Sequence, residues 1–192
     1  MPRSRKAPLV VAMAGASGAY AARLLLERSP WPTLLVVSRW ARAIYERECG
    51  PFDTLARLAS RVYDPSDLEA PPSSGSVPTA GMVILPCSIN TLAHIAGGLA
   101  DNLITRAAHC HLKERRPLIL GLRETPLTAI DLQNAARAAA AGAVVMPLSP
   151  PFFMFQGKSA EQISLHDLMG AYVDRVLALL GRPLAANWEN LI

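Results

Sequence analysis

Short apolar runs alternate with longer helical stretches along most of this sequence, and no other feature restricts its fold as strongly. Turn residues or small polar residues follow the runs, which lie at Leu9–Met13, Thr33–Val37, Gly81–Leu85, Leu118–Leu120 and Ala143–Pro147. Strands covered on both faces read as continuous apolar runs, and parallel strands need long crossovers that are usually helices. The alternation therefore predicts an α/β fold with a doubly wound parallel sheet built from βαβ units.

Chain length and composition set the expected organisation. For 192 residues we expect a single domain over 1–192, with an N-terminal tail at 1–7 and a C-terminal tail at 182–192. Hydrophobic residues make up 51% of the chain and charged residues only 18%. Because this is an apolar composition, we expect part of the surface to be buried between subunits of a homo-oligomer.

Charge and cysteine content exclude several classes of function. The net charge is +4, but the basic residues are dispersed and the one cluster, LKERR, has no interleaved aromatic residues. We therefore expect anionic small ligands and no nucleic acid. The three cysteines and four histidines follow no metal-ligand spacing, so we expect no metal. With no secretory signal and no apolar run of about 20 residues, we expect a cytoplasmic protein without a membrane span.

Small and charged residues follow the predicted strands, at the edge where parallel sheets bind ligands. The first run leads into a GASG turn at 15–18 and a helical stretch. This arrangement holds phosphate, although such turns also serve only to pack the first helix. Ser38 is a helix N-cap or a ligand contact, and the cap is the simpler interpretation. Arg123 and Glu124 follow another strand, and we assign Arg123 to the binding edge.

Other positions have a structural and a functional interpretation. Glu48 lies near the end of a helical stretch, where its charge opposes the helix dipole; this hints at a function, although a solvated helix end explains it nearly as well. Arg115 and Arg116 read as a solvated helix end. Cys87 has no evident basic partner and reads as a small buried residue rather than a nucleophile. The segment 52–70 reads as a variable connection.

Several motifs occur in a particular order along the chain. They are GASGA from Gly15, Ser38 with Glu48 ten residues on, SSGS from Ser73, PCSxxTL from Pro86, TRAA and LKERRPL after Asp101, RETPL from Arg123, GAVxxP from Gly142, and Arg175-Val176-Leu177. Together they resemble the UbiX/Pad1 family of flavin prenyltransferases over nearly the whole chain. The resemblance implies a flavodoxin-like or Rossmann-like fold, a homo-oligomer such as a dodecamer, and FMN bound partly at a subunit interface.

The resemblance also implies a reaction. A dimethylallyl group passes from dimethylallyl phosphate to N5 of reduced FMN, and ring closure at C6 follows. The product, prenylated FMN, serves a UbiD-type decarboxylase. The leaving group is inorganic phosphate, whose developing charge cations stabilise without a metal.

By similarity, the site residues have expected roles. Ser17 and Glu48 would handle protons and Glu124 would orient the cations, so these three are the expected catalytic residues. The expected FMN-binding residues are Gly15, Ala16, Ser17, Ser38, Ser88, Thr91 and Arg123. The expected substrate-binding residues are Ser74, Arg106, Lys113, Phe153 and Arg175, with Arg106 reaching the site of a neighbouring subunit.

The chain departs from the family pattern in three places. Phe152-Phe153 stands where Phe-Tyr is usual and where the Tyr hydroxyl binds substrate phosphate. The segment 155–162 is longer than usual, and Asp131 stands in place of a frequent His, with no role assigned to it. Two alternatives stay open: a related FMN-binding protein with cysteine-type decarboxylase chemistry, and a non-catalytic flavin carrier.

Overall fold

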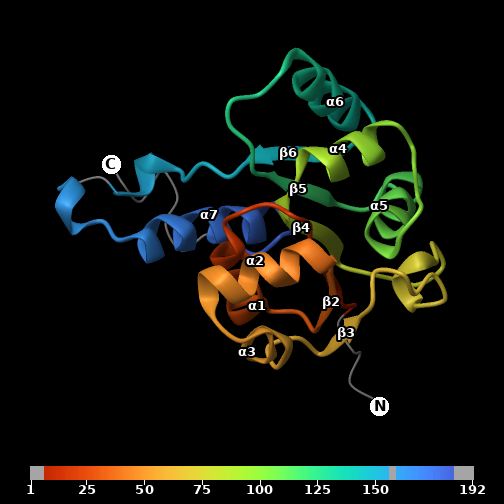
Figure 1. Cartoon of the computed structure of the whole chain (residues 1–192), viewed down its shortest axis with the longest axis horizontal. Helices are drawn as coiled ribbons and strands as arrows, with labels where there is room; N and C mark the ends of the chain where they lie inside the picture. The colour runs from red at the N-terminus through yellow and green to blue at the C-terminus, as the bar shows by residue number, and fades with distance from the viewer. Residues whose placement is uncertain (1–6, 156–158, 184–192) are drawn as a thin grey trace.

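The computed structural model describes residues 7–155 and 159–183. Most of the two expected tails, and the centre of the longer segment 155–162, lie outside the described residues. A six-stranded sheet runs through the middle of the protein (Figure 1), in the order β3-β2-β1-β4-β5-β6. The strands are β1 Leu9–Met13, β2 Thr33–Val37, β3 Arg61–Tyr63, β4 Gly81–Cys87, β5 Leu118–Leu122 and β6 Val144–Pro147.

All strand pairs in this sheet are parallel, which confirms the predicted doubly wound α/β fold. The six-stranded order is that of Rossmann folds, and without β3 the remaining order is that of flavodoxins. The strand order reverses between β1 and β4. After β1, the chain adds β2 and β3 on one side of it, and then crosses over to add β4, β5 and β6 on the other side. Ligands of such sheets bind beyond the carboxyl ends of the strands at this switch point.

Seven α-helices and three short 3₁₀ turns occur in the described part of the chain. The helices are α1 Ala19–Arg28, α2 Arg39–Cys49, α3 Phe52–Ala56, α4 Ile89–Ala96, α5 Leu103–Lys113, α6 Ala129–Ala140 and α7 Leu165–Leu179. The 3₁₀ turns are η1 Pro71–Ser73, η2 Phe152–Phe155 and η3 Ala160–Gln162. The described residues between β6 and α7, here called the projecting segment, extend from the body of the molecule (Figure 1).

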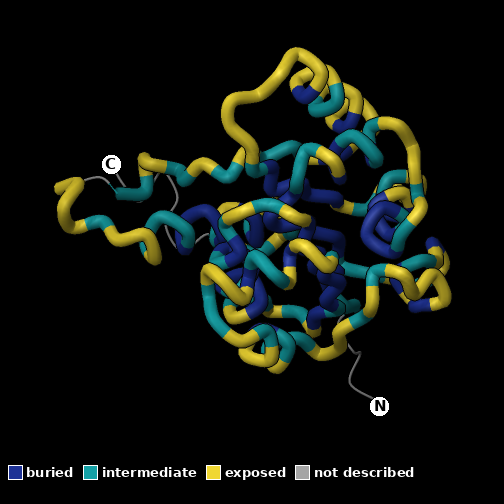
Figure 2. Tube along the Cα trace, in the orientation of Figure 1, coloured by how far each residue is buried: buried dark blue, intermediate teal, exposed yellow. Residues whose placement is uncertain are grey.

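Strand side chains alternate between two cores, one on each face of the sheet. In β1, Leu9 and Val11 pack with residues of α1, α2, α3 and α7, whereas Val10 and Ala12 pack with residues of α4, α5 and α6. Both cores are fully enclosed, and Figure 2 shows the buried residues gathered along the sheet, with the exposed ones on the outer helices and the projecting segment. Covering on both faces explains why the strands read as unbroken apolar runs.

Two strand predictions were wrong. The segment 52–70 was read as a variable connection, but it contains α3 and the edge strand β3. This strand has only three residues and is partly exposed, so it has no apolar run. We also expected Pro86 to end its strand, yet β4 continues to Cys87. Its pairing with β5 shifts register between Ile84 and Cys87, so the missing N–H of Pro86 falls at an irregular point of the ladder.

Five of the described helices, α2, α4, α5, α6 and α7, are capped by the side chain of the polar residue that precedes them. The Ser38 hydroxyl accepts a hydrogen bond from the N–H of Ala41, 3.2 Å away, which confirms its interpretation as an N-cap. Asp131, to which the sequence assigned no role, accepts hydrogen bonds from the backbone N–H and the hydroxyl of Thr128. These bonds, the one from the hydroxyl foremost, lower the pKa of Asp131. Asp131 therefore completes a capping box at the start of α6.

No helix in the described residues is both long enough and apolar enough to span a membrane.

Candidate functional site

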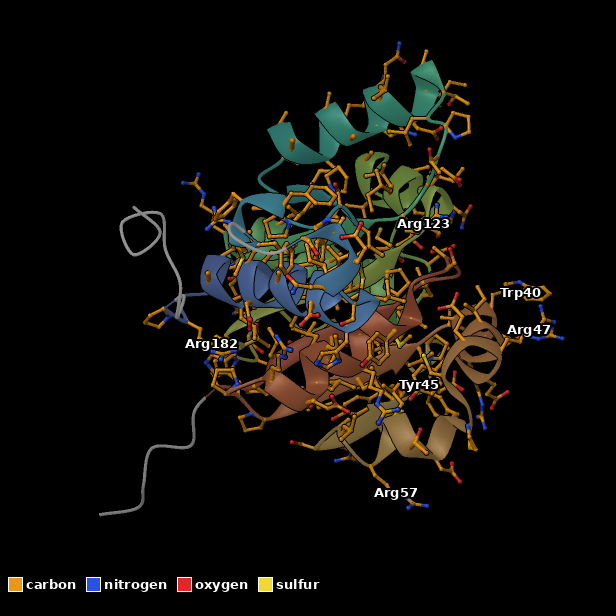
Figure 3. All side chains as sticks on the ribbon, turned by 90° about the vertical axis from the view of Figure 1, so that its left-hand side faces the viewer. Trp40, Tyr45, Arg47, Arg57, Arg123 and Arg182 are labelled. Atoms are coloured by element: carbon orange, nitrogen blue, oxygen red, sulfur yellow. The ribbon has the colours of Figure 1, made fainter. Side chains whose placement is uncertain are left out.

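A cleft of about 680 Å³ opens at the switch point, beyond the carboxyl ends of β1, β2, β4 and β5. It is lined by Gly15, Ala16, Ser17, Ser38, Trp40, Pro65, Ser88, Ile89, Asn90, Thr91, Asn102, Ile104, Arg123 and Glu124. Arg123 and Trp40 lie toward the same side of the molecule in Figure 3, and Arg182 lies toward the opposite side. The volume falls within the range of about 300–1,000 Å³ that is usual for small-molecule sites.

Three helices begin at this cleft, because α2, α4 and α5 each contribute residues from their first turn or their N-cap. The caps are Ser38, Ser88 and Asn102, whose side-chain oxygens accept hydrogen bonds from the N–H groups of the second or third residue of the helix. Each helix start carries a partial positive charge. The converging starts therefore make the cleft suited to an anionic group such as a phosphate.

Arg123 adds a full positive charge to the same cleft. Its backbone N–H donates to the carbonyl of Cys87, 3.0 Å away, so the ends of β4 and β5 are held together. Among the described residues, no carboxylate forms an ion pair with the Arg123 guanidinium. The guanidinium is half-exposed, and its fork of donors matches the oxygens of a phosphate.

All expected FMN-binding residues line this one cleft, together with the expected catalytic residues Ser17 and Glu124. They come from separate turns of the chain, and only the parallel sheet brings them to one place. Sequence reasoning missed Trp40, Pro65, Ile89, Asn90, Asn102 and Ile104. The signal for most of these was available, because residues that start a helix after a strand share the edge of the residues that end the strand.

A second cavity, of about 520 Å³, lies on the other side of the 15–18 turn and contains Glu48. Its other lining residues are Gly18, Tyr20, Leu165 and Met169. Ser17 and Glu48 were expected to act as a pair, but within one chain they line different cavities.

The Glu48 carboxylate caps the start of α1. It accepts hydrogen bonds from the N–H of Gly18 at 3.0 Å and from the N–H of Ala19 at 2.8 Å. In this structure these two N–H groups are therefore bonded to Glu48 rather than free for a phosphate. The position that looked unfavourable at the end of α2 is a favourable one at the start of α1.

Cys87 lies beneath the cleft and is fully buried. Burial raises the pKa of its thiol to about 12, so it carries no thiolate at neutral pH. This confirms the interpretation of Cys87 as a small buried residue.

The expected substrate-binding residues lie elsewhere in the same chain. Arg106 donates from Nε to the carbonyl of Ser73 at 3.0 Å, and the Lys113 amine pairs with Glu114 at 2.7 Å. The Ser74 hydroxyl bonds to that of Ser76. Arg175 is exposed on α7. None of these side chains lines the cleft that holds Arg123.

Phe153 also lies outside the cleft. It belongs to η2, in the projecting segment, and is 39% exposed. It therefore contributes nothing to the cleft of its own chain.

The separation follows from the path of the chain. The start of α5 lines the cleft, but the helix has 11 residues, so Lys113 at its end lies about 15 Å further along the helix axis. The chain then enters β5 at its amino end, whereas Arg123 follows the carboxyl end of the same strand. One chain thus builds the cleft but cannot bring Lys113 to it.

The residues of the cleft fit FMN. A phosphate suits the helix starts and Arg123, and Ser17, Asn90 and Asn102 offer groups for the hydroxyls of a ribityl chain. Trp40, Ile89 and Ile104 provide apolar surface for a flat ring system. No group of three or more His, Cys, Asp or Glu side chains within the described ranges is placed to hold a metal ion.

Comparisons with known proteins agree with this site. A family model described as Flavoprotein matches residues 2–176. The chain is 48% identical over 188 residues to the flavin prenyltransferase UbiX of Deinococcus radiodurans, with 95% of this chain and 93% of that protein covered. It is 42% identical to the flavin prenyltransferase UbiX of Thermoplasma acidophilum, with 94% and 99% covered.

Solved structures give the same result. The crystal structure of AnUbiX (PadA1), in complex with FMN and dimethylallyl pyrophosphate, has a TM-score of 0.88 and 39% identity, over 96% of this chain and 98% of that chain. A dodecameric FMN-dependent UbiX-like decarboxylase from Escherichia coli O157:H7 has a TM-score of 0.83 and 37% identity, over 94% and 98%.

Proposed function

This chain belongs to the flavoprotein family, among the UbiX flavin prenyltransferases, and on that premise we propose that it prenylates reduced FMN. The dimethylallyl group of a dimethylallyl phosphate forms a bond to N5 of the flavin while its C–O bond to phosphate breaks and N5 loses its proton. Protonation of the remaining C=C bond then lets its tertiary carbon bond to C6, which loses its hydrogen as a proton. The observation that carries this proposal is the single cleft lined by every expected FMN-binding residue.

The chain's own residues have distinct tasks in this proposal. Arg123 and the starts of α2, α4 and α5 bind the flavin phosphate and hold the cofactor at the switch point. FMN, when bound, supplies the nucleophilic nitrogen. Ser17 and Glu124 line the same cleft, where they exchange protons or orient cations. Glu48, across the 15–18 turn, acts as the carboxylate of the proton-transfer pair.

The prenyl phosphate needs cations that the cleft of one chain does not supply. Lys113 lies at the end of α5 and Arg106 in its first turn, where it bonds to the carbonyl of Ser73, next to Ser74. We therefore assign them to the site of a neighbouring copy, together with Arg175 and Phe153 on the projecting side of the molecule. A homo-oligomer is part of this proposal, and the related E. coli protein is dodecameric.

Three further features belong to the proposal. The chain forms one domain, which the single sheet with its two cores supports. It works in the cytoplasm, in line with the free cysteines Cys49, Cys87 and Cys110. Its product is handed to a UbiD-type decarboxylase.

The deciding experiment is an anaerobic incubation of the protein with reduced FMN and dimethylallyl phosphate, followed by extraction of the flavin and measurement of its mass. A gain of one C5 prenyl unit is the expected result. Bound but unmodified FMN would contradict the proposal and favour a flavin carrier. A Phe153→Tyr variant that then formed product would locate the defect at that side chain.

A further inference from the structure

The loop after η1 packs on α5 through a set of hydrogen bonds that were not predicted from the sequence. The Arg116 guanidinium donates from Nη1 to the carbonyl of Val77 at 2.6 Å and from Nη2 to the carbonyl of Gly75. Arg106 and the Cys110 thiol both donate to the carbonyl of Ser73. The carbonyls of alternate loop residues therefore all point at side-chain donors from α5 and the turn that ends it.

Arg116 is held in place by an unusual helix end. The N–H of Arg116 bonds to the carbonyl of His111 at 2.8 Å, and the N–H of Arg115 bonds to that of Leu112 at 3.1 Å. This is the pattern of a Schellman motif, in which the residue at the position of Arg115 adopts the left-handed conformation and is usually glycine. Arg115 has a φ of 54° and is the single non-glycine residue with a positive φ among those described. The turn directs Arg116 back onto the loop.

The loop packs closely against this helix end. A Cβ atom added to Gly75 would lie 2.6 Å from the Lys113 amine and 2.5 Å from a carboxylate oxygen of Glu114. Gly75 is buried, whereas Ser74 and Ser76 on either side of it are exposed. Their hydroxyls bond to each other at 2.8 Å. The residue between these two exposed serines therefore packs against the Lys113 amine.

We propose that Arg116 is a positioning residue for the substrate site. By binding the carbonyls of Gly75 and Val77, it holds the loop that carries the Ser74 and Ser76 hydroxyls against the helix end that carries Lys113. Together these groups form one surface, which binds the phosphate of the prenyl donor in the cleft of a second copy. This inference rests on the proposed function. It also changes the interpretation of Arg116 as a solvated residue, because its side chain is half-buried and bound to the loop.

The neighbouring residue provides a matched control. Arg116→Gln and Arg115→Gln remove the same charge one position apart, but only the first removes the bonds to the loop carbonyls. We expect Arg116→Gln to raise KM for dimethylallyl phosphate about 10-fold, the size of effect that a lost hydrogen bond to a charged group produces. Arg115→Gln should stay within about 2-fold of wild type, since an exposed surface charge contributes little. FMN affinity should be unchanged in both.

Two more variants separate positioning from a general loss of stability. Arg116→Lys keeps the charge but cannot donate to both carbonyls at once, so its KM for dimethylallyl phosphate should lie between those of wild type and Arg116→Gln. Ser74→Ala should raise KM by itself but add little in the Arg116→Gln background, because residues that act through one another are not additive. Equal KM values for the two glutamine variants, or fully additive effects, would overturn the inference.

Failure of this inference and failure of the proposed function give different results. If wild-type protein forms prenylated FMN and the two glutamine variants behave alike, only the role of Arg116 is wrong. If wild-type protein forms none, the proposed function is wrong. Amide hydrogen exchange at Ser76 and Val77 then still tests whether Arg116 holds the loop. Arg116→Gln should accelerate the exchange, and Arg115→Gln should not. If Arg116→Gln does not fold, the same comparison is made with Arg116→Lys.

Discussion

The two ends of the parallel strands differ in how much of a binding site one chain can build there. At the carboxyl edge, turns after β1, β2, β4 and β5 converge on a cleft with three helix starts and Arg123. At the amino ends of the strands, the end of α5 and the loop around Gly75 carry two hydroxyls and one amine, and none of these groups lines the cleft that holds Arg123. One chain thus brings all the expected FMN-binding residues to one cleft, whereas in our proposal the site for the second substrate needs another copy.

The largest expected effect concerns the Glu48 carboxylate, which bonds to the end of the 15–18 turn. Glu48→Gln should leave FMN bound but lower kcat by about 10²-fold or more, the usual contribution of a general acid or base. The amide oxygen of Gln still accepts from the start of α1, so the cap largely survives. Rapid-mix product assays measure the effect, and Glu46→Gln on the same helix is the control. Unchanged turnover would remove Glu48 from the mechanism.

Arg123→Ala tests whether the carboxyl edge holds the flavin. The variant should weaken FMN binding about 10- to 100-fold, since hydrogen bonds to charged groups contribute about 1.5–3 kcal/mol. Fluorescence titration of FMN gives the dissociation constant. Arg57→Ala removes an exposed arginine far from the cleft (Figure 3) and should leave it unaltered. Equal affinities for the two variants would place the flavin elsewhere.

Lys113→Ala tests whether the amine at the end of α5 binds the phosphate of the prenyl donor. It should raise KM for dimethylallyl phosphate about 10-fold while FMN affinity stays constant, because one charged hydrogen bond to the phosphate is lost. Arg137→Ala, an exposed arginine on α6, is the control. Oligomers mixed from Lys113→Ala and Arg123→Ala chains should recover activity, since some sites then combine an intact cleft with an intact Lys113. A lack of recovery would show that both side chains act within one chain.

The smallest expected effect is on stability at acidic pH. His111 is buried near the end of α5, where its Nδ1 bonds to the carbonyl of Ala107 and its Nε2 to the hydroxyl of Thr79. Burial lowers its pKa below the ordinary value of 6.5. Between 6.5 and the lowered pKa, the unfolded chain binds a proton that the folded chain does not.

The free energy of unfolding should therefore be fully retained above pH 6.5 and fall below it, by up to about 1.4 kcal/mol per pH unit. Urea unfolding at several pH values measures this slope. His111→Gln should flatten it, and His109→Gln, at an exposed position of the same helix, should not. An equal slope in both variants would assign the acid sensitivity to other groups.

Much of the flavin cleft was predictable because it depends on local patterns. Strand ends and helix starts were visible in the sequence, and a parallel sheet places all of them on one edge. Gly15, Ser38, Ser88 and Arg123 followed from that rule together with family motifs. The edge strand β3 was missed because its three residues are partly exposed and form no apolar run.

Contacts between distant parts of the chain were not predictable in the same way. Glu48 reaches Gly18 across 30 positions, and Arg116 reaches Gly75 across 41. Nothing local at either residue indicates its partner, since both read equally well as solvated groups at a helix end.

The sequence by itself determined the fold class, the positions of the long strands and several of the residues that line the flavin cleft, because apolar periodicity and turn chemistry act over a few neighbouring residues. Only the tertiary structure decided that Glu48 caps α1, that Arg116 clamps the loop at Gly75, and that Lys113 lies at the edge opposite Arg123. These outcomes depend on how helices pack over the sheet, and packing joins residues by distance in space rather than by distance along the chain.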